Sequence, residues 1–110
     1  MTLDEYQREA LVTAAFTEDN FKDLAHWVLG VTGEAGEIAE KLKKIVRDKN
    51  GEITLEDRDE IIKEIGDVMW YLAVLAEHLD VSFEEAGRRN ISKLRDRQKR
   101  NMIRGSGDNR

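Results

Sequence analysis

Two short stretches of the sequence, Glu34-Ala-Gly-Glu37 and Glu64-Ile-Gly-Asp67, share one pattern: an acid, any residue, glycine and a second acid. Each lies inside a long run with helical periodicity, and the turn signal Asn50-Gly51 separates the two runs. Residues three positions apart on an α-helix lie about 60° apart around its axis. The two stretches therefore predict two helices, each of which carries a pair of carboxylates on one face.

Apolar residues follow both runs at the spacing of one helix face, which predicts that the two helices pack together. Each acidic pair lies at the polar edge of its stripe, so packing the stripes brings the two pairs to one seam. The first stripe comprises Leu24, Trp27, Val31, Ala35, Ile38, Leu42 and Ile45, and the second comprises Ile61, Ile65, Val68, Leu72, Leu75, Ala76 and Leu79.

Four carboxylates at close range repel one another and take up protons unless a cation compensates them. Oxygen ligands in that number suit a hard divalent ion, Mg²⁺ or Mn²⁺, better than zinc. The alternative is that these acids are ordinary solvated residues of helix surfaces, but matched pairs at the same edge of two stripes favour a site. The sequence thus predicts a metal site formed by Glu34, Glu37, Glu64 and Asp67.

The composition indicates one small, mostly helical domain. The chain has 110 residues, no proline to break helices and no cysteine for a disulfide or thiolate site. No apolar run reaches the roughly 20 residues of a membrane span, and the N-terminus lacks the features of a signal peptide, so a cytoplasmic protein is expected. We predict an all-α, four-helix bundle-like domain over residues 1–100 and a flexible tail over residues 101–110. The helices are expected at about 2–15, 21–49, 54–79 and 82–100.

The charge is distributed unevenly along the chain. Residues 1–87 carry 21 acids and nine bases, whereas residues 88–110 carry nine bases and two acids. A basic end can bind nucleic acid, but this one lacks aromatic side chains for base stacking, so we favour a cationic wall that faces phosphates. Asn90 interrupts an apolar stripe, and Lys93 and Arg97 flank the same side. The alternative is a structural asparagine beside two solvated bases.

Four segments of the chain together resemble a known family. They are GEAGEIAEKLKK with Glu34 and Glu37, EIGDVMWYLAVLAEHL with Glu64 and Asp67, NISKLRDR, and the terminal GSGDNR. The pattern E-x-x-E, a gap of 26 residues, then E-x-x-D is similar to the signature of the MazG-like, all-α nucleoside triphosphate pyrophosphohydrolases. The likeness extends over nearly the whole chain, and it is to the short members with a single domain.

The resemblance implies a homodimer or a dimer of dimers that hydrolyses (deoxy)nucleoside triphosphates to the monophosphate and pyrophosphate. It implies that the four acids bind Mg²⁺, and Glu37, further from its stripe, is our choice of general base. Selectivity for dUTP/dCTP or for phosphoribosyl-ATP, and a non-catalytic helical dimerisation module, remain open alternatives. The positions expected near the nucleotide are Lys44, Tyr71, Asn90, Lys93 and Arg97.

Overall fold

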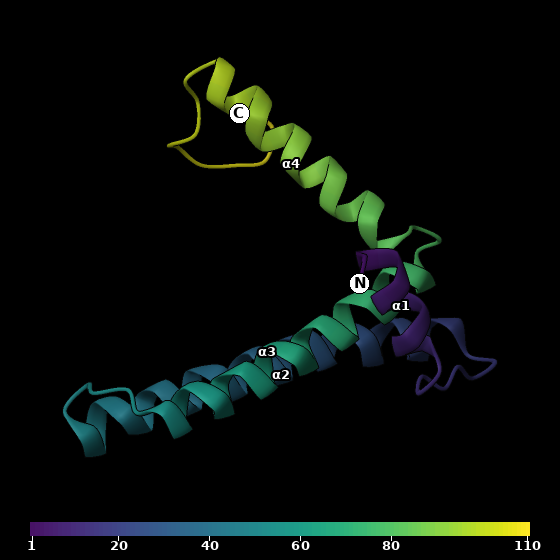
Figure 1. The fold of residues 1–110 in the computed structure, drawn as a ribbon. Helices are drawn as coiled ribbons and strands as arrows, with labels where there is room; N and C mark the ends of the chain where they lie inside the picture. The colour runs from purple at the N-terminus through teal and green to yellow at the C-terminus, as the bar shows by residue number, and fades with distance from the viewer.

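The chain folds into four α-helices and no strands, as the sequence predicts (Figure 1). A computed structural model describes all residues, 1–110. None of the helices combines the length and the apolar composition that crossing a membrane requires. The helices are α1 (Leu3–Leu11), α2 (Asn20–Lys49), α3 (Leu55–His78) and α4 (Phe83–Lys99).

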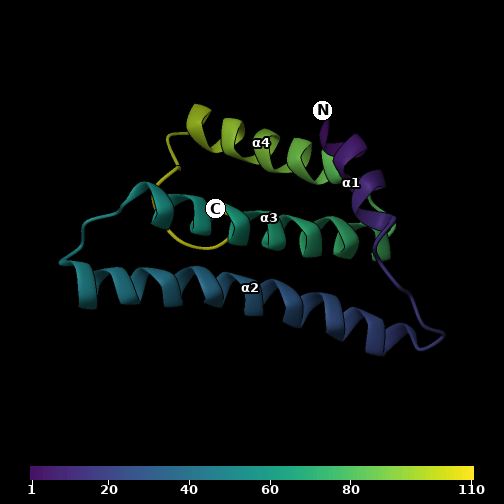
Figure 2. The same ribbon diagram turned by 60° about the horizontal axis from the view of Figure 1, so that its bottom comes forward.

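The two longest helices, α2 and α3, form a helical hairpin that is the main body of the molecule (Figures 1 and 2). Asn50 and Gly51 adopt positive φ angles of 52° and 80°, which end α2 as predicted. A capping box between Thr54 and Asp57 then begins α3. Because only a short loop joins the helices, they lie antiparallel, and the acidic stretches of both face the middle of the hairpin.

Helix α1 is shorter than the sequence predicts, since it ends at Leu11 rather than near Ala15. After Leu11 the chain continues as 3₁₀-type turns. The backbone N–H groups of residues 12–14 donate to the carbonyl oxygens three residues earlier, with N···O distances of 3.2 Å each. Thr13 explains the change. Its hydroxyl donates to the carbonyl oxygen of Ala10 at 3.0 Å and accepts the indole N–H of Trp70 at 2.8 Å. This contact fixes the end of α1 against α3.

Gln7 of α1 ties three parts of the chain together from a buried position. Its Nε2 donates to the carbonyl oxygens of Ala73 at 3.1 Å and Val81 at 3.2 Å. Its Oε1 accepts the backbone N–H of Phe83 at 3.0 Å. The single amide therefore satisfies groups in α3, in the loop after it and at the start of α4.

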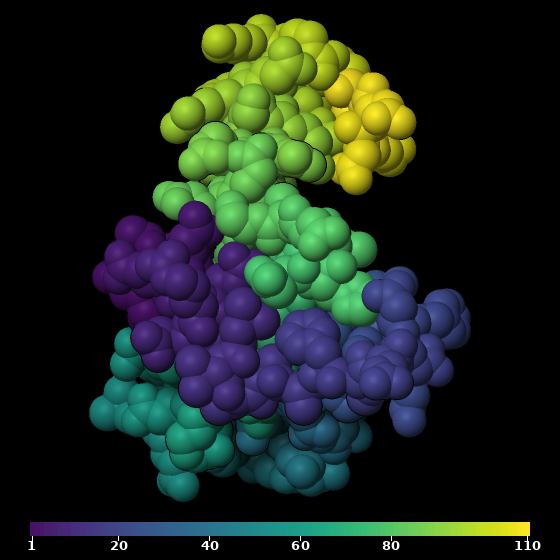
Figure 3. Space-filling view, turned by 90° about the vertical axis from the view of Figure 1, so that its right-hand side faces the viewer, coloured from purple at the N-terminus to yellow at the C-terminus, as the bar shows by residue number.

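Helix α4 leaves the hairpin at an angle instead of closing a bundle within one chain (Figure 1). It contacts α1 and α3 but not α2, and the space-filling view shows it as a separate lobe together with the tail (Figure 3). The radius of gyration is 17.0 Å, against about 13 Å for a compact domain of this length. Only nine of the 110 residues are buried. The single chain is therefore open, with a small core.

The tail, residues 101–110, contains no helix and folds back along α4. Arg100 Nη2 donates to the backbone oxygen of Arg110 at 2.6 Å, and Arg110 in turn donates to the carbonyl oxygens of Met102 at 3.2 Å and Ile103 at 3.0 Å. These bonds form a closed loop at the end of α4.

Replacing Gln7 tests the role of the buried amide. Gln7→Leu removes the amide partner of two carbonyl oxygens and one N–H, so we expect it to lower the free energy of unfolding by roughly 2–4 kcal/mol. Urea unfolding followed by circular dichroism measures the change. The control Gln98→Leu alters an exposed glutamine of α4 and should change stability by less than about 0.5 kcal/mol. Equal stability of the two variants would contradict the proposed role of Gln7.

Candidate metal centre

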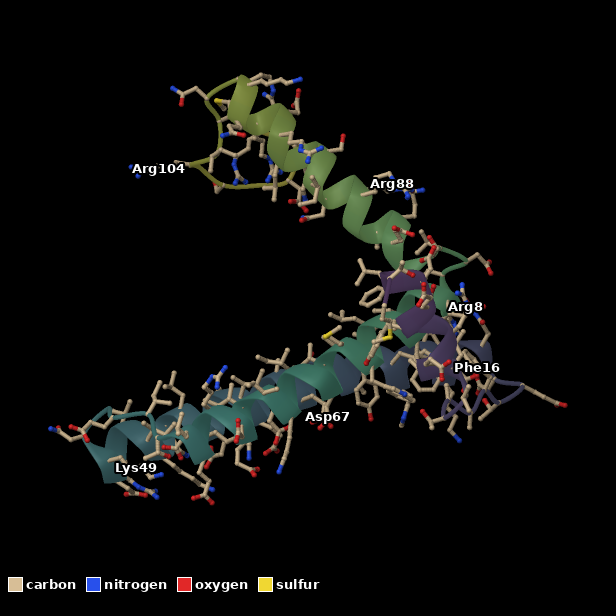
Figure 4. The ribbon with its side chains drawn as sticks, viewed as in Figure 1. Arg8, Phe16, Lys49, Asp67, Arg88 and Arg104 are labelled. Carbon is tan, nitrogen blue, oxygen red and sulfur yellow. The ribbon has the colours of Figure 1, made fainter.

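Three of the four predicted acids meet at the middle of the hairpin. Glu34 of α2 and Glu64 and Asp67 of α3 each place a carboxylate oxygen within 4.8 Å of the others. Figure 4 labels Asp67 about halfway along the hairpin. Glu64 and Asp67 lie one helical turn apart on α3, and Glu34 faces them across the seam. We call these three residues the acidic cluster.

The acidic cluster carries an electrostatic cost that is visible at Glu34. Partial burial raises the pKa of its carboxyl above the ordinary value, and the negative charges of Asp67 and Glu64 raise it further. Glu37 adds a smaller contribution of the same sign. The charges that the sequence pattern predicts to repel one another therefore do so in the folded chain.

Glu37 lies outside the acidic cluster. Its side chain is exposed, one turn after Glu34 on α2, and it does not share the close spacing of the other three acids. In the sequence pattern Glu37 lies further from the stripe than Glu34, yet the pattern predicts both glutamates as metal ligands. Within this chain, Glu37 is close enough for its charge to act on Glu34.

The acidic cluster has the chemistry of a site for a hard divalent ion. Three carboxylates from two packed helices supply only oxygen atoms, and no histidine belongs to the group. Oxygen-only ligand sets favour Mg²⁺ and Mn²⁺, which bind through a few carboxylates and keep several water molecules. A cation at this position would also relieve the repulsion that raises the pKa of Glu34.

Two residues next to the acidic cluster were not identified from the sequence. The Lys41 ammonium of α2 lies 3.3 Å from Glu64 Oε1. The Tyr6 hydroxyl of α1 donates to the carbonyl oxygen of Gly66 at 3.4 Å, and burial together with the charge of Asp67 raises the pKa of this tyrosine. Lys41 was detectable, because it lies four residues after Glu37 and so shares its helix face. Tyr6 was not, because only the crossing of α1 over α3 brings it there.

Tyr71 lies in the seam one turn after Asp67 and is half-buried. Its ring rests against Gly30 of α2, where a Cβ atom would come within 2.1 Å of the ring. The ring also packs edge-on against the ring of Trp70, with 4.9 Å between the ring centroids. Close approach of a side chain therefore explains the glycine at position 30, and it fixes the tyrosine near the acidic cluster.

Lys93 and Arg97 of α4 come together, but their partner in this chain is the tail. Asp108 Oδ1 lies 3.1 Å from Lys93 Nζ and 3.4 Å from Arg97 Nη2. Arg97 Nη2 also donates to the carbonyl oxygen of Asp108 at 2.7 Å, so the tail covers Arg97 until it is only 4% exposed. Both bases lower the pKa of Asp108 below its ordinary value through these contacts.

Two other predicted positions lie apart from the acidic cluster within one chain. Asn90 was expected within an apolar stripe of α4, yet it is exposed, as are Ile91 and Leu94 on the same helix, because α4 departs from the hairpin. Lys44 is exposed on α2 and lies 4.0 Å from Glu40 rather than beside the three carboxylates.

The profile of the MazG nucleotide pyrophosphohydrolase domain matches residues 23–102, which include the acidic cluster and α4. The chain belongs to the MazG family. Family members typically use a divalent metal ion, and the acidic cluster is the group of side chains here that could bind one. Membership also indicates a hydrolase that acts on nucleotides.

Two relatives of this MazG protein extend the comparison. The Gene 37 protein of Mycobacterium phage L5 is 49% identical over the whole of both chains. The uncharacterized protein YpjD of Bacillus subtilis (strain 168) is 37% identical over 76% of this chain and 74% of its own length. Neither name states a substrate. No solved structure matches the chain.

Glu34→Gln tests the repulsion in the acidic cluster. Because the folded-state pKa of Glu34 is raised, the folded chain binds more protons than the unfolded chain between the ordinary and the raised value. Glu34 therefore destabilises the metal-free fold fully above the raised pKa and not at all below the ordinary one. With a chelator present, Glu34→Gln should raise the Tm at pH 7.5 and leave it unchanged near pH 4.

Thermal unfolding at both pH values measures this difference, and Asp59→Asn, an exposed acid of α3 outside the acidic cluster, is the control. A Tm that Glu34→Gln lowers at pH 7.5, or raises equally at both pH values, would show that burial and repulsion of the Glu34 charge do not destabilise the fold.

Proposed function

We propose that the protein hydrolyses (deoxy)nucleoside triphosphates to the nucleoside monophosphate and pyrophosphate with Mg²⁺, and that Mn²⁺ can replace it. The observation that carries this proposal is the acidic cluster of Glu34, Glu64 and Asp67 at the packed centre of a MazG domain. A site built only from carboxylates attracts a hard cation, and that cation attracts polyphosphate. The expected substrate is therefore an anion that binds together with its metal.

A divalent ion bound here supplies charge neutralisation on the phosphates and a water molecule of lowered pKa. The part of the chain is to hold three carboxylates at fixed spacing on two rigid helices. Glu37, exposed next to Glu34, is free to take the proton of the attacking water as general base. In this mechanism Glu34, Glu64 and Asp67 bind the metal ion. Replacing Glu37 removes the base but leaves these three metal ligands in place.

The phosphate-side positions form the second part of the proposal. Lys93 and Arg97 contact the Asp108 carboxylate, which is the kind of anion that a phosphate would replace. Arg97 Nε is buried without a hydrogen-bond partner, so the tail uses only part of the guanidinium fork that can bind phosphate in two places. We assign Lys93, Arg97 and Asn90 to binding of the triphosphate. We assign Tyr71 to binding of the nucleotide beside the acidic cluster. Lys44 is the weakest of these assignments.

We also propose a homodimer or a dimer of dimers. Apolar side chains on all the long helices remain exposed, among them Leu42 and Val46 of α2, Ile65 of α3 and Ile91 of α4. A chain that leaves these faces exposed buries less apolar surface than a compact domain of its length, and a second copy offers the same apolar faces. Light scattering at micromolar concentration should give a mass of at least twice 12.7 kDa, and an active monomer would refute the proposed assembly.

A panel of nucleotides with Mg²⁺, scored for monophosphate and pyrophosphate, tests the activity. We expect Asp67→Asn and Glu37→Gln to fold normally and to lose nearly all turnover, on the order of 10²-fold or more for a group that acts in the reaction. The Asp67→Asn substitution removes a metal ligand, and the Glu37→Gln substitution removes the general base. Asp59→Asn, an exposed acid of the same helix as Asp67, should retain full activity.

The outcomes of this panel are distinct. Full Mg²⁺-dependent turnover by Asp67→Asn would contradict the metal site, whereas full turnover by Glu37→Gln would contradict only the choice of base. Turnover restricted to dUTP and dCTP, or to phosphoribosyl-ATP, would replace the broad substrate class with a selective one. An absence of turnover with every substrate would favour a non-catalytic dimerisation module.

A further inference from the structure

Lys41 is the lysine of α2 whose ammonium reaches the acidic cluster. It lies 3.3 Å from Glu64 Oε1 and 3.7 Å from Glu60 Oε2, both on the opposite helix. Its side chain is 29% exposed, and that of Glu64 is 16% exposed. Lys43 and Lys44 behave differently, since their side chains are largely exposed and pair with Glu40 of their own helix.

The helix register explains this position. Lys41 follows Glu34 by seven residues, or about two turns, so it lies on the same face of α2. Glu60 precedes Glu64 by four residues on α3 and so faces Lys41 from the other side. A lysine can lay its aliphatic stem along such a seam while its ammonium reaches the polar groups at the edge.

Lys41 counteracts a force that acts on Glu64. The negative charges of Glu34 and Asp67 repel the carboxylate of Glu64, and this repulsion favours orientations of its side chain that point away from the acidic cluster. The ammonium contacts one oxygen of Glu64, Oε1, at 3.3 Å. The contact therefore offsets part of the repulsion and restricts the side chain to the seam.

From these contacts we infer that Lys41 is a positioning residue that holds Glu64 in the orientation needed to bind the divalent ion. The inference rests on the proposed metal site and adds a residue to it. Outer partners that hydrogen-bond a metal ligand commonly change metal affinity by 10- to 100-fold when removed. A lysine could instead repel the metal ion, but two carboxylates, those of Glu64 and Glu60, lie within 3.7 Å of the Lys41 ammonium. Glu60 shares its charge between Lys41 and Lys63, whose ammonium is 2.8 Å away.

The test measures Mn²⁺ binding by titration calorimetry on the full-length, metal-free protein, without substrate. We expect Lys41→Met to weaken Mn²⁺ binding about tenfold and Lys41→Arg to restore most of the affinity, because arginine keeps the charge and the donors. The matched control is Lys49→Met. Lys49 also joins α2 to α3, by a 2.7 Å pair with Asp57, and lies at the far end of the hairpin (Figure 4). Its removal should leave Mn²⁺ affinity unchanged.

Each other outcome overturns the inference in a recognisable way. Unchanged binding by Lys41→Met removes the positioning role, and tighter binding shows that Lys41 acts as a competing cation. Equal losses in Lys41→Met and Lys49→Met would indicate a general effect on the hairpin. Wild-type protein that binds no Mn²⁺ would reject the metal site itself, which separates that failure from the others. If Lys41→Met does not fold, Lys41→Gln is measured and interpreted in the same way.

Discussion

The apolar seam between α2 and α3 is the constraint on which the rest of the structure depends. Buried residues of both helices, such as Ile45 and Val74, fix how the hairpin packs. That packing places Glu34, Glu64 and Asp67 within 4.8 Å of one another, where partial burial and the like charges together raise the pKa of Glu34. The hydrophobic effect thus holds together groups that electrostatics would separate, which leaves a strong local preference for a bound cation.

The second constraint is how little surface one chain can bury. Helix α4 packs only near its start, and the radius of gyration of 17.0 Å is that of an open molecule. As a result Lys93 and Arg97 lie on α4, away from the acidic cluster between α2 and α3. Within this chain they contact Asp108 of the tail. A second copy that covers the exposed apolar faces would give α4 a partner and would bring basic and acidic surfaces closer than a single chain does.

Local patterns in the sequence predict most of the fold and the meeting of Glu34, Glu64 and Asp67 between the two long helices. Periodicity, caps and the Asn50-Gly51 turn specify the helices because these signals act over a few residues. The same patterns put Glu37 further from the stripe than Glu34 but could not show that it lies outside the acidic cluster, since the distance of each side chain from α3 depends on how the two helices pack. They also place Asn90 inside an apolar stripe, but Asn90 is exposed in the structure. It is exposed because α4 departs from the hairpin, and no local signal in the sequence specifies that direction. Tyr6 could not be identified because only the crossing of α1 over α3 brings its hydroxyl to the carbonyl oxygen of Gly66, 60 residues away in the chain.

The most direct measurement of the central claim is the position of the metal ion. Crystals of the protein grown with Mn²⁺ and measured at the manganese absorption edge would locate the ion by its anomalous signal. The structure described here predicts a peak between α2 and α3, within coordination distance of Glu34, Glu64 and Asp67. A manganese peak elsewhere on the molecule, or three carboxylates paired only with protein groups in the presence of saturating Mn²⁺, would contradict it.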